Sequence, residues 1–155
     1  MIVTALKDKF SRPYLEFLHC NLGKFNSYNT LFQSEAPNFF TLKTETCKLI
    51  RSLCSDFMDV SFVKNADISL LTPTHPMFSN TFVLYLGVSA SASVSTMRLS
   101  GAATKEELSQ FQKSCQSFLI EAVLQIQKRF SLNDRIHDTV ACIDPHSAST
   151  LNLPP

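Results

Sequence analysis

The 155-residue sequence lacks tryptophan, contains only three glycines, and has no long hydrophobic run. A membrane-spanning helix needs about 20 consecutive apolar residues, and no stretch of this chain approaches that length. With so few glycines there is no phosphate-cradling loop, and no Gly-x-Ser-x-Gly motif marks a nucleophilic serine. The N-terminus has no basic start followed by an apolar run, so no signal peptide is visible.

Charge is also sparse. Fourteen Lys and Arg residues against thirteen Asp and Glu residues give a net charge of +1, without a cluster of either sign. Nucleic-acid-binding surfaces usually show a basic patch or stripe, and the composition supplies none. Hydrophobic residues make up 45% of the chain and charged residues 17%, which predicts one folded domain and not a disordered chain.

The five cysteines show no paired Cys-x-x-Cys spacing. Each lies within or beside an apolar helical pattern, where cysteine acts as a small hydrophobic residue. We therefore expect reduced, buried thiols in an intracellular protein. They are Cys20, Cys47, Cys54, Cys115 and Cys142.

The segment 14–37 carries the clearest pattern, a run of residues spaced 3, 4, 3, 4 and 3 apart. This spacing predicts a helical seam like that of a coiled coil, with one polar position. The seam is our candidate interaction surface, made of Leu15, Leu18, Leu22, Phe25, Asn29 and Phe32. Asn29 would be either a device that fixes register and pairing or a position at the surface edge that happens to fit the spacing, and we favour the second reading.

Further helices are predicted on either side of this seam. A short first helix covers 2–10, and the seam helix runs from Pro13, which suits a first turn, to about Phe32. Gly23 would weaken that helix by roughly 1 kcal/mol against Ala and would allow a close crossing. A third helix, from an N-cap at Asn38 to Phe57, would pack antiparallel on the second because the connection is short.

The fourth helix has the strongest start signal. Thr104 is the expected N-cap, and Glu107 three residues later completes a capping box. One apolar stripe follows it to the helix end: Leu108, Phe111, Cys115, Phe118, Leu119, Ala122, Val123, Ile126 and Phe130. A last short helix would start at the cap residues Ser131 and Asp134 and reach Cys142, before Pro145 stops it.

Between the third and fourth helices the pattern weakens. The apolar run 82–86 could form a short strand or a buried helical turn, and periodicity does not distinguish them. The small residues of 89–96 favour a loop or a helix over an exposed strand. The sequence thus predicts a single mainly α domain over 1–146, an antiparallel bundle with an irregular middle, and a frayed tail at 147–155.

No catalytic, metal-binding or cofactor-binding residue can be assigned. The adjacent pair His19 and Cys20 points about 100° apart on a helix, too divergent for one metal ion. His75, His137 and His146 are read as surface or capping histidines. The pairs Asp56/Asp59 and Asp134/Asp138 resemble acidic helix starts, and neither has a physical reason to lose its solvent.

The order of several segments nevertheless resembles a known family. The segments are Tyr14-Leu15-Glu16-Phe17-Leu18, Asn29-Thr30-Leu31-Phe32-Gln33-Ser34-Glu35, Tyr85-Leu86-Gly87, Phe118-Leu119-Ile120-Glu121-Ala122, Gln127-Lys128-Arg129-Phe130 and Ile143-Asp144-Pro145. Over most of residues 6–146 they resemble the C-terminal half of hAT-superfamily transposases. They equally resemble host proteins derived from these transposases, including BED- and SCAN-type zinc-finger proteins with transposase-like bodies.

The resemblance implies a place within that architecture. In the family a ribonuclease-H-like core is interrupted by a large helical insertion, and three acidic residues bind divalent metal for strand cleavage. This chain is similar to part of the helical insertion. The zinc finger, the core strands with the first two acids and the dimerisation region have no counterpart, and no residue matches a catalytic acid.

We therefore expect a non-catalytic fragment or domesticated remnant of a hAT-like transposase. It would act as a nuclear scaffold that contacts protein, with DNA contact implied by the resemblance alone; without the resemblance, only an intracellular location is expected. The alternative is a free-standing helical module that self-associates through its helical faces. No enzymatic activity, cofactor or membrane partner is expected.

Overall fold

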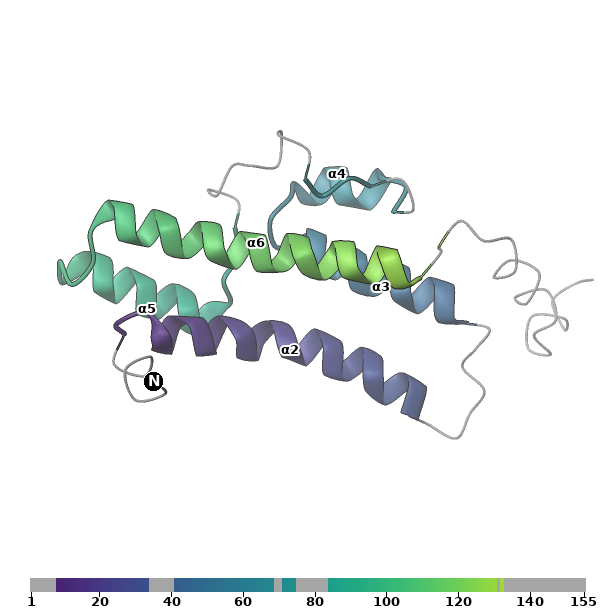
Figure 1. The fold of residues 1–155 in the computed structure, drawn as a ribbon, viewed down its shortest axis with the longest axis horizontal. Coiled ribbons are helices and arrows are strands. Elements are labelled where there is room, and N and C mark those ends of the chain that lie inside the picture. Colours follow the sequence, from purple (N-terminus) through teal and green to yellow (C-terminus); the bar gives the residue numbers. More distant parts are fainter. Residues whose placement is uncertain (1–7, 34–40, 69–70, 75–83, 131, 133–155) are drawn as a thin grey trace, which may run out of the picture.

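The computed structural model describes residues 8–33, 41–68, 71–74, 84–130 and 132. They form a mainly α-helical domain, as predicted, and no strand occurs among them. The helices, labelled as in Figure 1, are α2 Ser11–Gln33, α3 Leu42–Cys54, α4 Val60–Asn65, α5 Val88–Leu99 and α6 Lys105–Arg129. None of these five combines the length and hydropathy that a membrane crossing requires.

The two longest helices, α2 and α6, run in the same direction, and α3 and α5 run in the opposite one (Figure 1). Both α3 and α5 contact α2 and α6. The domain is therefore a helical bundle with three positions. The long helices α2 and α6 occupy one position each, and α3 and α5 together occupy the third. The predicted antiparallel packing of the second and third helices is confirmed.

Aromatic pairs join α2 to α6 at successive levels. Phe111 lies between Phe10 and Tyr14, with ring centroids 5.4 and 4.6 Å away. Phe17 meets Phe118 edge-on at 5.7 Å, and Tyr28 meets Phe130 at 6.5 Å. The Phe10–Phe111 pair is stacked and the other three are edge-to-face. Aromatic pairs of both kinds add to the hydrophobic gain from burial, and here they set which residues of the two helices lie level.

The start of α6 is as predicted. Thr104 Oγ1 accepts the Glu107 N–H at 3.2 Å, and Glu107 Oε2 accepts the Thr104 N–H at 2.8 Å. The predicted stripe is also the buried side, with one exception. Phe118 is 37% exposed at the edge of the stripe, whereas five members are buried: Leu108, Phe111, Cys115, Leu119 and Val123.

The start of α2 is likewise as predicted, with Pro13 in the first turn. The predicted close crossing at Gly23 is wrong. A Cβ built on Gly23 would meet no atom within 4 Å, and the residue is exposed, so it marks no close crossing.

The irregular middle packs through backbone contacts. Leu84 to Leu86 form neither a strand nor a helical turn, and the Tyr85 N–H donates to the Asp56 carbonyl at 2.6 Å. Gly87 follows with φ +89°, and a Cβ there would lie 2.9 Å from Cys20 Cβ and Sγ. Glycine is required because this backbone region is strained for other residues. The small-residue segment 89–96 then lies within α5, in line with the favoured loop or helix.

The short helix α4 is held by side chains of its neighbours. Asp59 caps its start by accepting the Phe62 N–H at 3.0 Å. At its end, the Arg51 guanidinium donates to the carbonyls of Val63, Lys64 and Ala66. Gln127 of α6 donates to Ile68 and Leu71 just beyond. An exposed six-residue helix would be marginal alone, so these contacts keep it in place.

The remaining predicted boundaries either differ from the structure or lie outside the described residues. The helix predicted to reach Phe57 ends at Cys54, although Phe57 is buried below it. The cap position of α3 is Thr41. Several predicted features lie outside the described residues: the span 2–7 of the first helix, the cap Asn38, residues 82 and 83 of the apolar run, the last helix through Cys142 and the tail 147–155.

Candidate protein-interaction face

The structure divides the predicted seam of α2. Leu18 and Phe25 pack against the core, but Leu15 and Leu22 remain 59% and 50% exposed. Asn29 is exposed, in line with the surface-edge reading, and the Phe32 side chain is not described. The seam therefore lies at the edge of the side of α2 that packs inward, and only part of it is covered.

The inward side of α2 is rotated from the seam and includes polar residues. Phe17 and Asn21 are buried at its centre, and Lys24 reaches α3. Sequence periodicity missed this side because Asn and Lys seldom lie in a core. Two of the seam leucines, Leu15 and Leu22, are left facing outward.

Phe118 of α6 is also partly exposed: its ring packs on Phe17, and 37% of the residue stays exposed. Residues three and four apart lie on one side of a helix, so Leu15, Leu18 and Leu22 share one side of α2. We name these three leucines the α2 face.

Polar residues are exposed beside the α2 face and on α6. His19 is exposed on α2, and its imidazole has no hydrogen-bond partner within the described part of the chain. On α6 the exposed Glu121 accepts the Gln125 side-chain N–H at 2.7 Å through Oε1. An apolar centre with a polar border is the usual anatomy of a protein interface.

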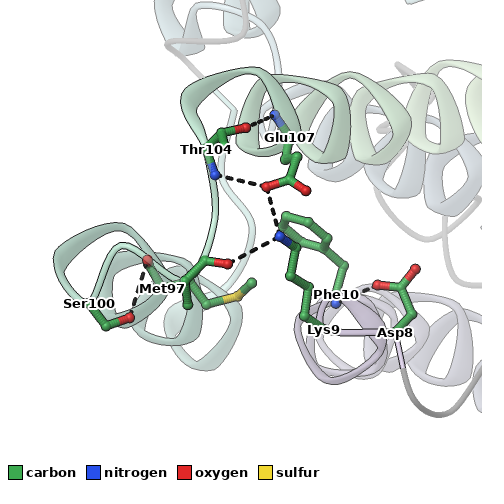
Figure 2. Close-up of polar contacts among 8 residues, drawn as sticks. Asp8, Lys9, Phe10, Met97, Ser100, Thr104 and Glu107 are labelled. Atoms are coloured by element: carbon green, nitrogen blue, oxygen red, sulfur yellow. Dashed lines mark hydrogen bonds and ion pairs between the residues drawn. The ribbon is translucent and has the colours of Figure 1, made fainter.

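A groove of about 460 Å³ lies between the start of α2 and α5. Its charged residues bond to one another or to α6. Lys9 Nζ contacts Glu107 Oε2 at 2.7 Å and the Ala102 carbonyl at 3.1 Å (Figure 2). Glu16 accepts from Ser93 at 2.5 Å and from Arg12 at 2.9 Å. These contacts hold the helices together, so the charged residues of the groove have a structural role in the fold.

The same contacts lower the pKa of two carboxyl groups. Hydrogen bonds from Ser93 and then from Arg12 lower the pKa of Glu16. The hydrogen bond from Lys9, followed by the backbone N–H of Thr104, lowers the pKa of Glu107. Both carboxylates are thereby favoured in the charged form that their structural bonds need.

The aspartate pair Asp56/Asp59 behaves differently from the prediction. Asp59 caps α4, but Asp56 is only 6% exposed and bonds to Lys24 of α2. Burial raises the pKa of Asp56, and the Lys24 ammonium opposes that rise. The expectation that neither aspartate loses its solvent is therefore wrong for Asp56, because a lysine thirty-two residues away covers it.

The cysteine side chains are mostly inside. Cys54 and Cys115 are buried, and burial raises the pKa of each thiol to about 12. Cys20 and Cys47 are half-buried, and burial also raises the pKa of Cys47. Cys142 lies outside the described residues. A thiol with a raised pKa is a poor nucleophile, which fits the predicted packing role.

No three residues among His, Cys, Asp and Glu converge as metal ligands in the described ranges. His19 lies alone on α2, and the other histidines and the Asp134/Asp138 pair fall outside those ranges. Comparison with protein-family models, curated proteins and solved structures finds no match for this chain. The hAT resemblance therefore stays a prediction from the sequence.

Proposed function

We propose that this chain is a helical scaffold domain that works by binding another protein and performs no catalysis. The observation that carries the proposal is the α2 face, where Leu15 and Leu22 are half or more exposed. Exposed aliphatic side chains gathered on one side of a helix, with polar neighbours, are typical of protein interaction sites.

The ionic contacts of the domain support a structural reading. Lys9–Glu107, Arg12–Glu16 and Lys24–Asp56 each join two helices or stiffen one. Asp59 and Thr104 cap helices. These charged groups already have a role in the fold.

Site-specific photo-crosslinking in cells tests the scaffold function. A photoreactive amino acid replaces Leu22 in the full chain, and the matched control carries it at Leu99, which is 88% exposed on α5. We expect one discrete adduct from position 22 and none from position 99. The same products from both positions, or none from either, would contradict the proposal.

The family resemblance gives a second candidate, a domesticated hAT-like remnant that acts as a nuclear scaffold with protein or DNA contacts. Its support is the ordered set of sequence segments, together with a helical fold of the kind the resemblance implies. A tagged full chain should accumulate in the nucleus. DNA contact should appear as binding that weakens steeply with added salt. A chain that stays in the cytosol and does not bind DNA would rule this candidate out.

A further inference from the structure

We infer that α5 is a detachable cover on α2, a helix that unfolds locally while the rest of the bundle stays folded. This opening is independent of the proposed scaffold function. Elements with few buried apolar contacts open at a lower free energy than the core of a domain. Four properties of α5 point to such an opening: its burial, its composition, its cap and its attachment to α2.

The first property is the small amount of apolar surface that α5 buries. Of its twelve residues only Ala90 is buried, and Val94 packs against the core while staying partly exposed. Near the two ends of the helix, Val88 is 78% and Leu99 is 88% exposed. By contrast, α3 and α6 bury five and six residues. Little hydrophobic stabilisation therefore holds α5 in place.

The second and third properties concern the helix itself. Seven of its twelve residues are serine, valine or threonine, which have lower helix propensity than alanine or leucine. Its cap position is Gly87, which has no side chain to accept the N–H groups of the first turn, whereas Asp59 and Thr104 do so for α4 and α6. Isolated helices shorter than about 12–15 residues are marginal in water, so α5 depends on its neighbours.

The fourth property is the way in which α5 is attached to α2. Ser93 Oγ of α5 donates to Glu16 Oε2 of α2 at 2.5 Å. Just before α5, the Gly87 backbone lies so close to α2 that a Cβ there would be 2.9 Å from Cys20 Sγ. These contacts are small in area, and their loss uncovers the Cys20 thiol.

The chain on either side of α5 is held by other contacts. Before the helix, the Tyr85 N–H donates to the Asp56 carbonyl, and Leu86 is buried. After it, the Ala102 carbonyl accepts a hydrogen bond from Lys9 at 3.1 Å (Figure 2). Both anchors stay in place when α5 unfolds, so the opening is confined to the helix and the turn that follows it.

Hydrogen exchange of the purified full chain, measured by mass spectrometry at several low urea concentrations, tests the opening. We expect the amides of α5 to exchange at least about tenfold faster than those of α3 and α6. Their protection should depend little on urea, because a local opening exposes little surface, whereas protection in α6 should fall as urea is added. Exchange of α5 in step with α3 and α6 at every urea concentration would overturn the inference.

Two matched variants test the attachment. Ser93→Ala removes the bond to Glu16, whereas Ser95→Ala makes the same change at an exposed position of α5. Alanine raises helix propensity by a similar amount at both positions, so the difference between the variants reports the bond. We expect α5 to exchange about threefold faster or more in Ser93→Ala than in Ser95→Ala. Equal exchange in the two variants would also overturn the inference.

Thiol labelling tests what the opening uncovers. Alkylation of Cys20 by iodoacetamide, located by peptide mass mapping, should be faster in Ser93→Ala than in Ser95→Ala by the same factor as the exchange of α5. This factor is expected because the thiol becomes accessible in the open state. Equal rates of Cys20 alkylation in the two variants would refute α5 as its cover.

Discussion

At the residue scale, two glycines differ in their effect on stability: one lowers helix stability and the other is required by its backbone conformation. Gly23 lies exposed inside α2 with open space where a Cβ would be. Gly87 combines φ +89° with Cys20 atoms 2.9 Å from its would-be Cβ. Of these two positions, only that of Gly87 requires glycine.

We expect Gly23→Ala to raise the free energy of unfolding by about 1 kcal/mol, because alanine loses less backbone freedom in a helix. Gly87→Ala should lower it by at least about 1 kcal/mol, since backbone strain and the contact with Cys20 add together. Urea unfolding followed by circular dichroism measures both. Changes of equal sign in the two variants would contradict this account.

Asn21 is the second residue-scale feature, a polar side chain only 1% exposed in the core. Its Nδ2 donates to the Phe17 carbonyl at 3.1 Å, but Oδ1 has no hydrogen-bond partner among the residues that the structure describes. A buried acceptor without a partner costs about 1–3 kcal/mol.

We therefore expect Asn21→Leu, similar in branching, to be neutral or to stabilise the domain by up to about 1 kcal/mol. Asn21→Asp should destabilise it by more than that, because a charge would be buried without a partner. Thermal unfolding compares the two, with the exposed Asn26→Leu as control. A large loss of stability in Asn21→Leu would show that the amide has an essential partner.

At the element scale, α4 depends on its neighbours more than on its own sequence. The Arg51 guanidinium reaches three carbonyls at the helix end, at 2.5, 3.1 and 3.2 Å. The last carbonyls of a helix lack partners within it, and a planar guanidinium can serve several at once.

We expect Arg51→Lys to increase the hydrogen-exchange rate of the amides in α4 about tenfold or more, since a single ammonium group cannot replace the several N–H donors of the planar guanidinium. Exchange in α6 should stay unchanged. Lys48→Ala, one turn away and exposed, serves as control. Unaltered exchange in α4 would mean that Val63, buried beneath it, holds the helix alone.

At the scale of the whole molecule, carboxyl groups with opposite pKa shifts make stability depend on pH. The pKa of Asp56 is raised above 3.8 by burial, so its contribution to stability is present at low pH and is lost as pH rises through the folded pKa. The pKa of Glu16 is lowered from 4.5 by its hydrogen bonds. Its contribution is present above that value and is lost as pH falls through the folded pKa.

The two neutralised variants should therefore diverge. As pH falls from about 7 to about 3, the parent chain should gain stability relative to Asp56→Asn and, below 4.5, lose it relative to Glu16→Gln. Urea unfolding across that range measures both differences. The same sign for both would show that the two carboxyl groups do not differ in the way their surroundings imply.

What the sequence determined by itself is local. The capping box at Thr104, the start of α2 near Pro13 and the buried stripe of α6 all depend on residues within about one helical turn. The fold class followed, because several helical segments joined by short connections pack as a bundle.

What only the tertiary structure decided is the rotation of each helix about its own axis. The seam of α2 reads as a packing surface, yet Phe17 and Asn21 are buried and Leu15 and Leu22 face outward. The partners that fix this rotation are distant in sequence: Asp56 for Lys24, and Phe118 for Phe17. Periodicity shows that a helix has an apolar side, but only contacts between remote segments decide which side the core covers and which side stays exposed.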